Sequence, residues 1–345
     1  KYLILSFPYS NHYYYQLFKG ENQESFLTGL QNIFDHMGAV PSRILFDNLS
    51  AAVTMRKGTR TKNTGFLKFE MHYKFAAEFC NVNAGNEKGN VENKVGYHRR
   101  NFMVPVPEIS DFKAYNEAAF LKSENDMNRM HYKKERLISE LYVEDKNAFN
   151  SLPENPYDIY RIEKARCNKY GIIHLDSKRY SVSPTYAQKQ VWAYIYYDKI
   201  QIKDEAHHLL MEHQRLYGSQ KESMNWLPYL DLIQKKPRAL KHIKFYKTLP
   251  ENWQQLFDES ELPKQRDYLS ILSTILVEST LDVAEQVLAE TLKYDVSDCD
   301  SIKTTYQRLK NTSKIMGEFK AENTPLLPPY NPDLEVYSQL MGSGN

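Results

Sequence analysis

The sequence predicts a mixed α/β region, then a small all-β barrel, then an α-helical C-terminal region. Three observations support this order. The first 46 residues alternate strand, strand, helix and strand, which favours a sheet with helices on its faces. From Tyr160 onward apolar residues recur with a period of two, as in strands. Between Tyr268 and Leu292 they recur with helical spacing.

Composition limits the classes of function. With 345 residues and 41% apolar content, the chain can bury several cores, and we expect two or three units. The net charge of +2 gives no global basic field, so any nucleic-acid-binding surface must be local. Cys80, Cys167 and Cys299 show no CxxC spacing, which indicates free thiols in a reducing compartment. No apolar run approaches the roughly 20 residues that span a bilayer, so we expect an intracellular protein without membrane contact.

The α/β region begins with two strands, residues 1–7 and 12–18, that pair across a short turn. An amphipathic helix follows, with Asn22 as its expected N-cap and Gly38 as its expected stop. Residues 43–46 then predict a buried strand.

Two acids are candidate metal ligands. Asp47 follows the strand 43–46, where α/β sheets place ligand chemistry, although an Asp before an Asn is also an ordinary turn or cap. Glu92 falls in the first turn of a helix, where a carboxylate also offsets the macrodipole. We expect the two carboxylates to meet across a divalent metal ion.

Basic residues surround the second acid. Glu92 stands close to five of them: Lys88, Lys94, His98, Arg99 and Arg100. The acid and the basic residues around it have one common explanation: the carboxylate binds a hard metal ion, and the cations hold a nucleic-acid backbone. Further cations between Arg56 and Lys62 indicate either a solvated loop or a flexible arm for phosphates.

Several stretches together resemble the transposases of the IS21 insertion-sequence family (IstA type), within the retroviral-integrase-like DDE superfamily. The stretches are RILFDNLSAAV, HYKFAAEFCN, EKGNVENKVGYHRRNFMVPVP and RYSVSPTYAQKQVWAYIYYDKIQI. The likeness runs from residue 1 to about residue 217 and keeps the order of the family's motifs. It implies an RNase H-like catalytic domain in which two aspartates and a glutamate hold two Mg²⁺ ions, with Mn²⁺ as a possible substitute. Asp47 matches the second acid and Glu92 the third.

The chain departs from the family at the first acid, which lies on the first strand of the RNase H-like sheet. No substitute is apparent, because Glu21 and Glu24 sit at a turn and a helix start, and Asp35 lies within the helix. We therefore expect an amino-terminally truncated chain. Mg²⁺-dependent strand cleavage and strand transfer need the carboxylate that bridges both ions, so the chain alone should be inactive.

The β-region is the second place where DNA contact is expected. In the resembling family a small β-barrel contacts transposon-end DNA, and the candidate phosphate ligands here are Lys178, Arg179, Lys189 and Arg215. Scattered surface lysines are also common. We expect Trp192 in the barrel core rather than on a base-stacking platform.

These readings give five segments. They are the catalytic core 1–108, a helical connector 109–159, the barrel 160–217, a helical region 218–321 and a disordered tail 322–345.

The resemblance also implies partners. These are transposon-end and target DNA, a separate AAA+ ATPase helper (IstB type), and further copies of the chain on DNA, in the bacterial cytoplasm near the nucleoid. The helical region is either a small bundle or the docking surface for that ATPase. Two other functions remain open: a noncatalytic DNA-binding or assembly remnant, and an RNase H-type nuclease, which would not need the barrel.

Overall fold

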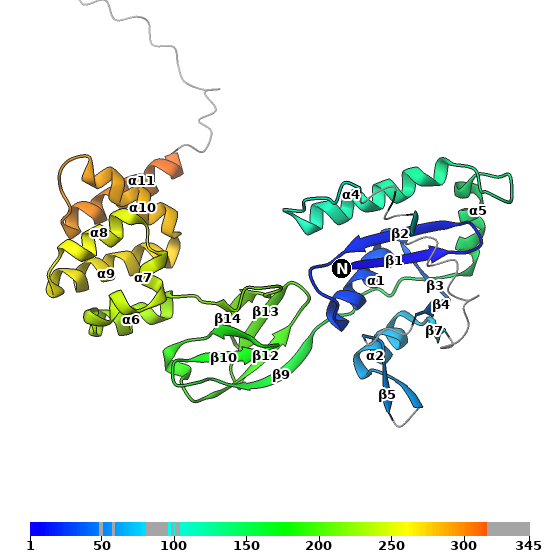
Figure 1. Ribbon diagram of the computed structural model, residues 1–345, viewed down its shortest axis with the longest axis horizontal. Coiled ribbons are helices and arrows are strands. Elements are labelled where there is room, and N and C mark those ends of the chain that lie inside the picture. The colour runs from blue at the N-terminus through cyan, green and yellow to red at the C-terminus, as the bar shows by residue number, and fades with distance from the viewer. Residues whose placement is uncertain (48–50, 57–58, 81–95, 98–99, 101–103, 316–345) are drawn as a thin grey trace, which may run out of the picture. The chain divides into compact units, whose positions relative to one another are not determined.

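A computed structural model describes residues 1–47, 51–56, 59–80, 96–97, 100 and 104–315. The chain divides into two compact units, Lys1–Asn225 and Trp226–Asn345 (Figure 1). No helix in the described ranges combines the length and apolarity needed to cross a membrane.

The first unit opens with an antiparallel hairpin of β1 (Tyr2–Phe7) and β2 (His12–Leu17). Helix α1 (Gln23–Met37) follows, and its predicted ends are confirmed. The Asn22 side chain accepts a hydrogen bond of 2.8 Å from the Ser25 amide, which satisfies one unpaired amide of the first turn. Gly38 ends the helix at φ 69°, a left-handed conformation that glycine adopts without steric cost.

Short strands and a helix continue this region. They are β3 (Ala39–Pro41), β4 (Arg43–Phe46), β5 (Val53–Arg56), β6 (Thr59–Lys62), α2 (Thr64–Tyr73) and β7 (Ala76–Phe79). Strands β4 and β7 pair in parallel, with α2 on the connection between them. The stretch expected to be a loop or arm instead contains the hairpin β5–β6. Its alternation of Thr with longer side chains suits a strand pair.

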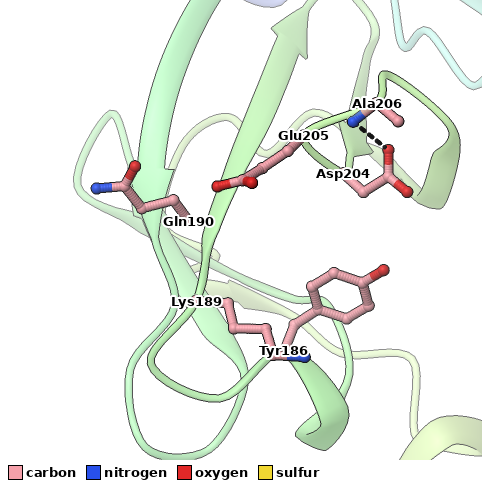
Figure 2. Close-up of a pocket in the computed structure, with 6 residues that line it drawn as sticks. All are labelled: Tyr186, Lys189, Gln190, Asp204, Glu205 and Ala206. Atoms are coloured by element: carbon pink, nitrogen blue, oxygen red, sulfur yellow. Dashed lines mark hydrogen bonds between the residues drawn. The ribbon is translucent and has the colours of Figure 1, made fainter.

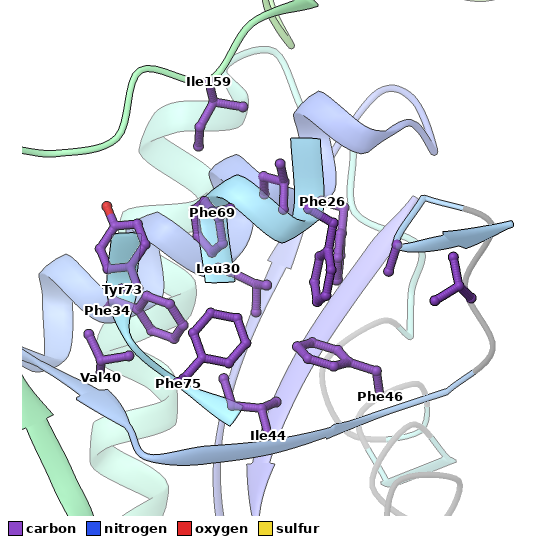
Figure 3. Packing of buried hydrophobic residues seen from close by; sticks show 14 residues of the cluster. Phe26, Leu30, Phe34, Val40, Ile44, Phe46, Phe69, Tyr73, Phe75 and Ile159 are labelled. Carbon is purple, nitrogen blue, oxygen red and sulfur yellow. The ribbon is translucent and has the colours of Figure 1, made fainter. Parts of the chain in front are cut away.

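Aromatic side chains hold these elements together. Phe26 of α1 contacts Phe46 of β4 and Phe66 of α2, with ring centroids 5.7 and 6.1 Å apart. Phe69 and Phe75 extend the same cluster (Figure 3). Leu3 and Leu5 of β1 also pack against the cluster, so both helices and the two parallel strands share one core with the hairpin.

The segment expected to be a connector is packed onto the hairpin. Its elements are α4 (Phe112–Asn125), η1 (Asp126–Asn128), α5 (Ile138–Asp145), η2 (Lys146–Ala148) and β8 (Phe149–Ser151). Ala119 of α4 is buried with Tyr13 and Tyr15 of β2. Asn116 exchanges two hydrogen bonds with the Leu17 backbone, at 2.8 and 3.0 Å. Strand β8 pairs with β3, so this segment belongs to the α/β region.

The sheets of the α/β region are small. Among the described residues its strands form four two-stranded pairs: β1–β2, β3–β8, β4–β7 and β5–β6. The mixed α/β class agrees with the prediction, whereas the described strands of this region do not join into a single continuous sheet.

The β-region is built from two sheets. The first contains β9 (Arg161–Arg166), β12 (Gln190–Ile195), β13 (Lys199–Lys203) and β14 (Leu209–Gln214), in the order β14-β13-β12-β9. The second contains β10 (Ile172–Leu175), β11 (Lys178–Ser181) and β15 (Glu222–Ser223), with η3 (Pro184–Tyr186) after β11. Residues 160–225 are all described, and no hydrogen-bonded pairing closes these two sheets into one barrel.

The expected closed barrel is therefore wrong, and the buried side chains give the reason. Ile173 and Tyr180 from the three-stranded sheet pack against Val191, Ile195 and Ile202 from the four-stranded sheet. Facing sheets bury their inner residues against each other without closure.

The second unit is helical, as predicted. Its elements are α6 (Leu227–Lys235), η4 (Pro237–His242), α7 (Lys244–Thr248), α8 (Glu251–Glu259), α9 (Leu262–Glu278), α10 (Leu281–Leu292) and α11 (Cys299–Ile315). The amphipathic segment expected between residues 268 and 292 forms two helices that separate after Glu278. The second helix, α10, has its own N-cap, since the Thr280 side chain accepts a hydrogen bond from the Val283 amide. Trp253 is completely buried, and its indole N–H donates to the Ala284 carbonyl at 3.0 Å. The expected tail 322–345 lies outside the described residues.

Candidate active site and nucleic-acid interface

Asp47 lies at the carboxyl edge of the parallel pair β4–β7. The two strands are in register through Phe46 and Phe79, and the Cys80 amide donates to the Phe46 carbonyl at 2.9 Å. Phe46 is buried in the aromatic core, whereas Asp47, one residue further, is exposed. The predicted strand with an acid at its end is therefore confirmed. The buried Phe46 anchors the backbone directly before Asp47.

The predicted second metal ligand, Glu92, lies outside the described residues. The same holds for four of the predicted basic residues around Glu92, namely Lys88, Lys94, His98 and Arg99. The fifth, Arg100, is described and is exposed.

Nearby carboxylates have other partners. Glu70 binds the Lys62 ammonium at 2.7 Å and accepts from the Ala77 amide at 2.9 Å. Glu78 binds Arg43 at 2.9 Å. Within the described ranges, no group of three or more His, Cys, Asp or Glu side chains is arranged to hold a metal ion. The carboxylate of Asp47 is the hard oxygen ligand that Mg²⁺ prefers, but a site there needs a further ligand.

Arg215 has a different role from the surface phosphate ligand that we predicted. Only 7% of it is exposed, and its guanidinium donates to Glu24 at 3.1 Å, to Asp176 at 3.0 Å and to the Tyr196 carbonyl at 2.8 Å. A buried arginine with three acceptors satisfied inside the protein is not available to a DNA phosphate. The prediction was wrong because residues distant in sequence enclose the side chain.

Arg161 completes this ion-pair network. It lies 3.3 Å from Glu24 and 3.0 Å from Asp176, so two arginines alternate with two carboxylates. Burial raises the pKa of Asp176, but hydrogen bonds and charge from Arg161 and Arg215 outweigh it and hold that pKa below its ordinary value. The network joins the first turn of α1 to the β-region. No local sequence pattern predicts this network, since Glu24 and Arg215 are 191 positions apart.

The other predicted phosphate ligands lie toward the surface. Lys178 donates to the carbonyls of Gly218 and Gln220, each at 2.6 Å, and Arg179 pairs with Glu222 at 2.6 Å. These bonds fix the segment that leads into β15.

Lys189 lines a pocket of about 460 Å³ (Figure 2). The same pocket is lined by Asp204 and Glu205, and the Asp204 carboxylate accepts from the Ala206 amide at 2.9 Å. Two carboxylates beside one ammonium do not favour an anion inside the pocket. A phosphate contact of Lys189 stays a prediction, as it does for Lys178 and Arg179.

The known proteins that this chain resembles are all described as transposases. Residues 152–225 match the family described as "Mu transposase, C-terminal domain". The chain is 28% identical over 277 residues to a "Transposase for insertion sequences IS1326/IS1353" of Pseudomonas aeruginosa, covering 76% of this chain and 53% of that protein. A protein of the same name from Shigella flexneri gives the same figures.

A further relative, a "Transposase" of Aminobacter aminovorans, is 27% identical over 281 residues, which is 78% of this chain and 54% of that protein. The chain thus spans about half the length of the curated relatives it matches. By sequence, it is related to the transposases of insertion sequences.

Proposed function

We propose that this chain provides a large part of a DNA transposase of the IS21 type, which cuts and joins DNA strands at the ends of an insertion sequence. The observation that carries the proposal is the similarity to insertion-sequence transposases over 277 residues. The exposed acid at the carboxyl edge of β4–β7 supports it, because that edge is where parallel strands place ligand chemistry.

Asp47 and Glu92 are the proposed ligands of Mg²⁺ or Mn²⁺. In strand transfer such ions activate the attacking oxygen and stabilise the leaving oxygen. Asp47 would hold an ion at the strand edge through its carboxylate. Arg100 and its basic neighbours in sequence would hold the DNA backbone beside it.

We also propose that these residues alone do not catalyse strand transfer, because none of the three acidic residues that precede Asp47 lies on a strand, where the first acid of an RNase H-like site would be. Glu24 is buried between two arginines, and Glu21 pairs with Lys1 at 3.0 Å. Asp35 lies on α1. The full reaction would further require paired DNA ends, additional copies of the chain and the AAA+ ATPase helper.

The metal site can be tested by titrating Mn²⁺ and measuring the free ion by electron paramagnetic resonance. Asp47→Asn and Glu92→Gln should each weaken binding at least about 10-fold, since even loss of a group that only orients a ligand costs that much. Glu78→Gln on the neighbouring strand is the control, because its carboxylate is bound to Arg43. Equal affinities in all four proteins would rule out the site.

The activity itself is tested by incubating the chain, Mg²⁺ and labelled duplex carrying transposon-end sequence. We expect binding without strand transfer. Mg²⁺-dependent cleavage that disappears in Asp47→Ala would disprove the proposed inactivity and leave the site assignment intact. The noncatalytic alternative predicts a different pair of results. The wild-type chain would bind no metal ion, and its salt-dependent DNA binding would be unchanged in a variant that lacks both acids.

A further inference from the structure

Trp192 lies on the outer face of the four-stranded sheet, not in the core where we expected it. Along β12, Val191, Ala193 and Ile195 are buried, whereas Trp192 and Tyr194 between them are partly exposed. Successive side chains of a strand point to opposite faces, so the two aromatic rings share the outer face. The cross-strand partners of Trp192 are Lys164 on β9 and Lys203 on β13.

The aromatic rings on this face form a continuous group. The His207 ring is stacked on Trp192 with centroids 5.8 Å apart and planes at 25°, and its Nδ1 lies 3.0 Å from the Tyr194 hydroxyl. Tyr160 joins the other end, 5.1 Å from Tyr194 and 5.5 Å from Tyr196. Five rings therefore line one side of the sheet.

Cations are interleaved with the rings. The ammonium of Lys203 lies 4.0 Å from the centre of the Tyr194 ring. The Lys164 ammonium lies 5.4 Å from the centre of the Trp192 ring, and the Lys199 ammonium lies 5.4 Å from the centre of the Tyr196 ring. Arg166 is exposed at the end of β9. On β14, Glu212 faces this surface and pairs with Lys199 at 3.3 Å. The charge of Asp158 also acts on Tyr160 and Tyr196, so the four cations named here exceed the two carboxylates and the balance is positive.

From this arrangement we propose that the outer face of β9-β12-β13-β14 binds unpaired, single-stranded DNA, with bases stacked on Trp192 and Tyr194 and phosphates held by Lys164 and Lys203. Aromatic rings beside lysines are the combination that recognises single strands. This inference rests on the proposed function and adds a substrate form to it.

The spacing of the rings favours a single strand over a duplex. Residues two apart on a strand are separated by about 6.7 Å, twice the 3.4 Å rise of stacked bases in one DNA strand. Bases in a duplex also cover each other's faces. Only a strand whose bases are unstacked can offer a free face to each ring.

The experiment measures fluorescence anisotropy of the full chain with two labelled probes, a 15-nucleotide oligo-dT and a 15-base-pair duplex. Trp192→Leu keeps an apolar side chain but removes the π-face, and Trp192→Phe keeps a ring. We expect Trp192→Leu to weaken oligo-dT binding about 10-fold and Trp192→Phe clearly less, with duplex binding changed less than about 2-fold. Lys203→Ala should lower the salt dependence of oligo-dT binding by about 0.7 in the log–log slope.

Tyr170→Leu is the matched control. This tyrosine is 59% exposed with the Lys169 ammonium 5.1 Å from its ring centre, but it lies between β9 and β10 and not on a strand of the proposed face. It should change oligo-dT binding less than about 2-fold.

Two results would overturn the inference while leaving the proposed function standing: unchanged oligo-dT binding in Trp192→Leu, or equal losses on oligo-dT and duplex. A wild-type chain that binds neither probe would overturn both. Circular dichroism of each variant excludes unfolding as the cause of lost binding.

Discussion

The guanidinium of Arg215 has three acceptors inside the protein, so its replacement is informative about stability. In Arg215→Met the carboxylate of Glu24, which is 4% exposed, keeps only its contact with Arg161. Removal of one partner from a buried ion pair costs about 3–5 kcal/mol, and the remaining arginine places the expected loss near the lower end. Urea unfolding at pH 7 measures the change in free energy of unfolding.

The control for that measurement is Arg179→Met. Arg179 pairs with Glu222 at 2.6 Å, but its side chain is 46% exposed, and exposed pairs contribute about 0–1 kcal/mol. If both variants lost the same stability, the buried network would have no special importance for the first unit.

At the scale of elements, His213 of β14 joins the two sheets of the β-region. Its Nε2 lies 2.7 Å from the Ser181 carbonyl on β11, and its Nδ1 lies 2.9 Å from the Ser223 hydroxyl on β15. Burial lowers the pKa of His213 below its ordinary value. Below about pH 6.5 the unfolded chain takes up a proton at this position that the folded chain does not.

The free energy of unfolding should therefore fall as the pH is lowered from 7 toward 5, since a lowered folded-state pKa stabilises the fold only above the unfolded pKa. His213→Asn should flatten this dependence, whereas His174→Asn, an exposed histidine on β10, should preserve it. Denaturation curves at several pH values provide the test. An unchanged slope in His213→Asn would contradict the assignment.

The sequence predicts an element well when the residues that shape it are close to it in the chain. Helix α1 was predicted with both ends, because Asn22 and Gly38 act on neighbouring backbone. Strand β12 was predicted, but not its buried face. One face of this strand carries Val191, Ala193 and Ile195, and the other carries Trp192, Tyr194 and Tyr196. Because both faces are apolar or aromatic, the alternation alone does not identify the buried face.

Sheet closure and the ion-pair network depend on distant residues, which explains why both escaped prediction. Closure of the β-region depends on pairing between edge strands. The position of Arg215 depends on Glu24 in another part of the chain. The carboxylate pair was predicted from motifs, and Asp47 is where the strand pattern put it, while Glu92 lies outside the described residues.

At the scale of the whole molecule, the two compact units should respond separately to loss of a core side chain. Trp253 is fully buried among the helices of the second unit, and removal of such a ring costs about 3–5 kcal/mol. In Trp253→Ala we expect faster hydrogen exchange across residues 226–315 and unchanged exchange in residues 1–225. Mass spectrometry of peptic fragments measures both in one experiment.

Leu232→Ala is the control, because this leucine of α6 is 49% exposed and its loss should leave exchange nearly unchanged. Faster exchange in both units of Trp253→Ala would show that they unfold as one.

The contact between Glu24 and Arg215 also sets an order of events during synthesis. Ribosomes add about 5–20 residues per second, so Arg215 follows Glu24 by roughly 10–40 seconds. Until Arg161 is added, the carboxylate in the first turn of α1 has neither of its arginine partners and must stay hydrated, and it lacks Arg215 through the whole interval. The buried junction between helix and β-region can form only after β14 has left the ribosome. Any factor that binds the nascent chain earlier meets α1 with this charged end exposed.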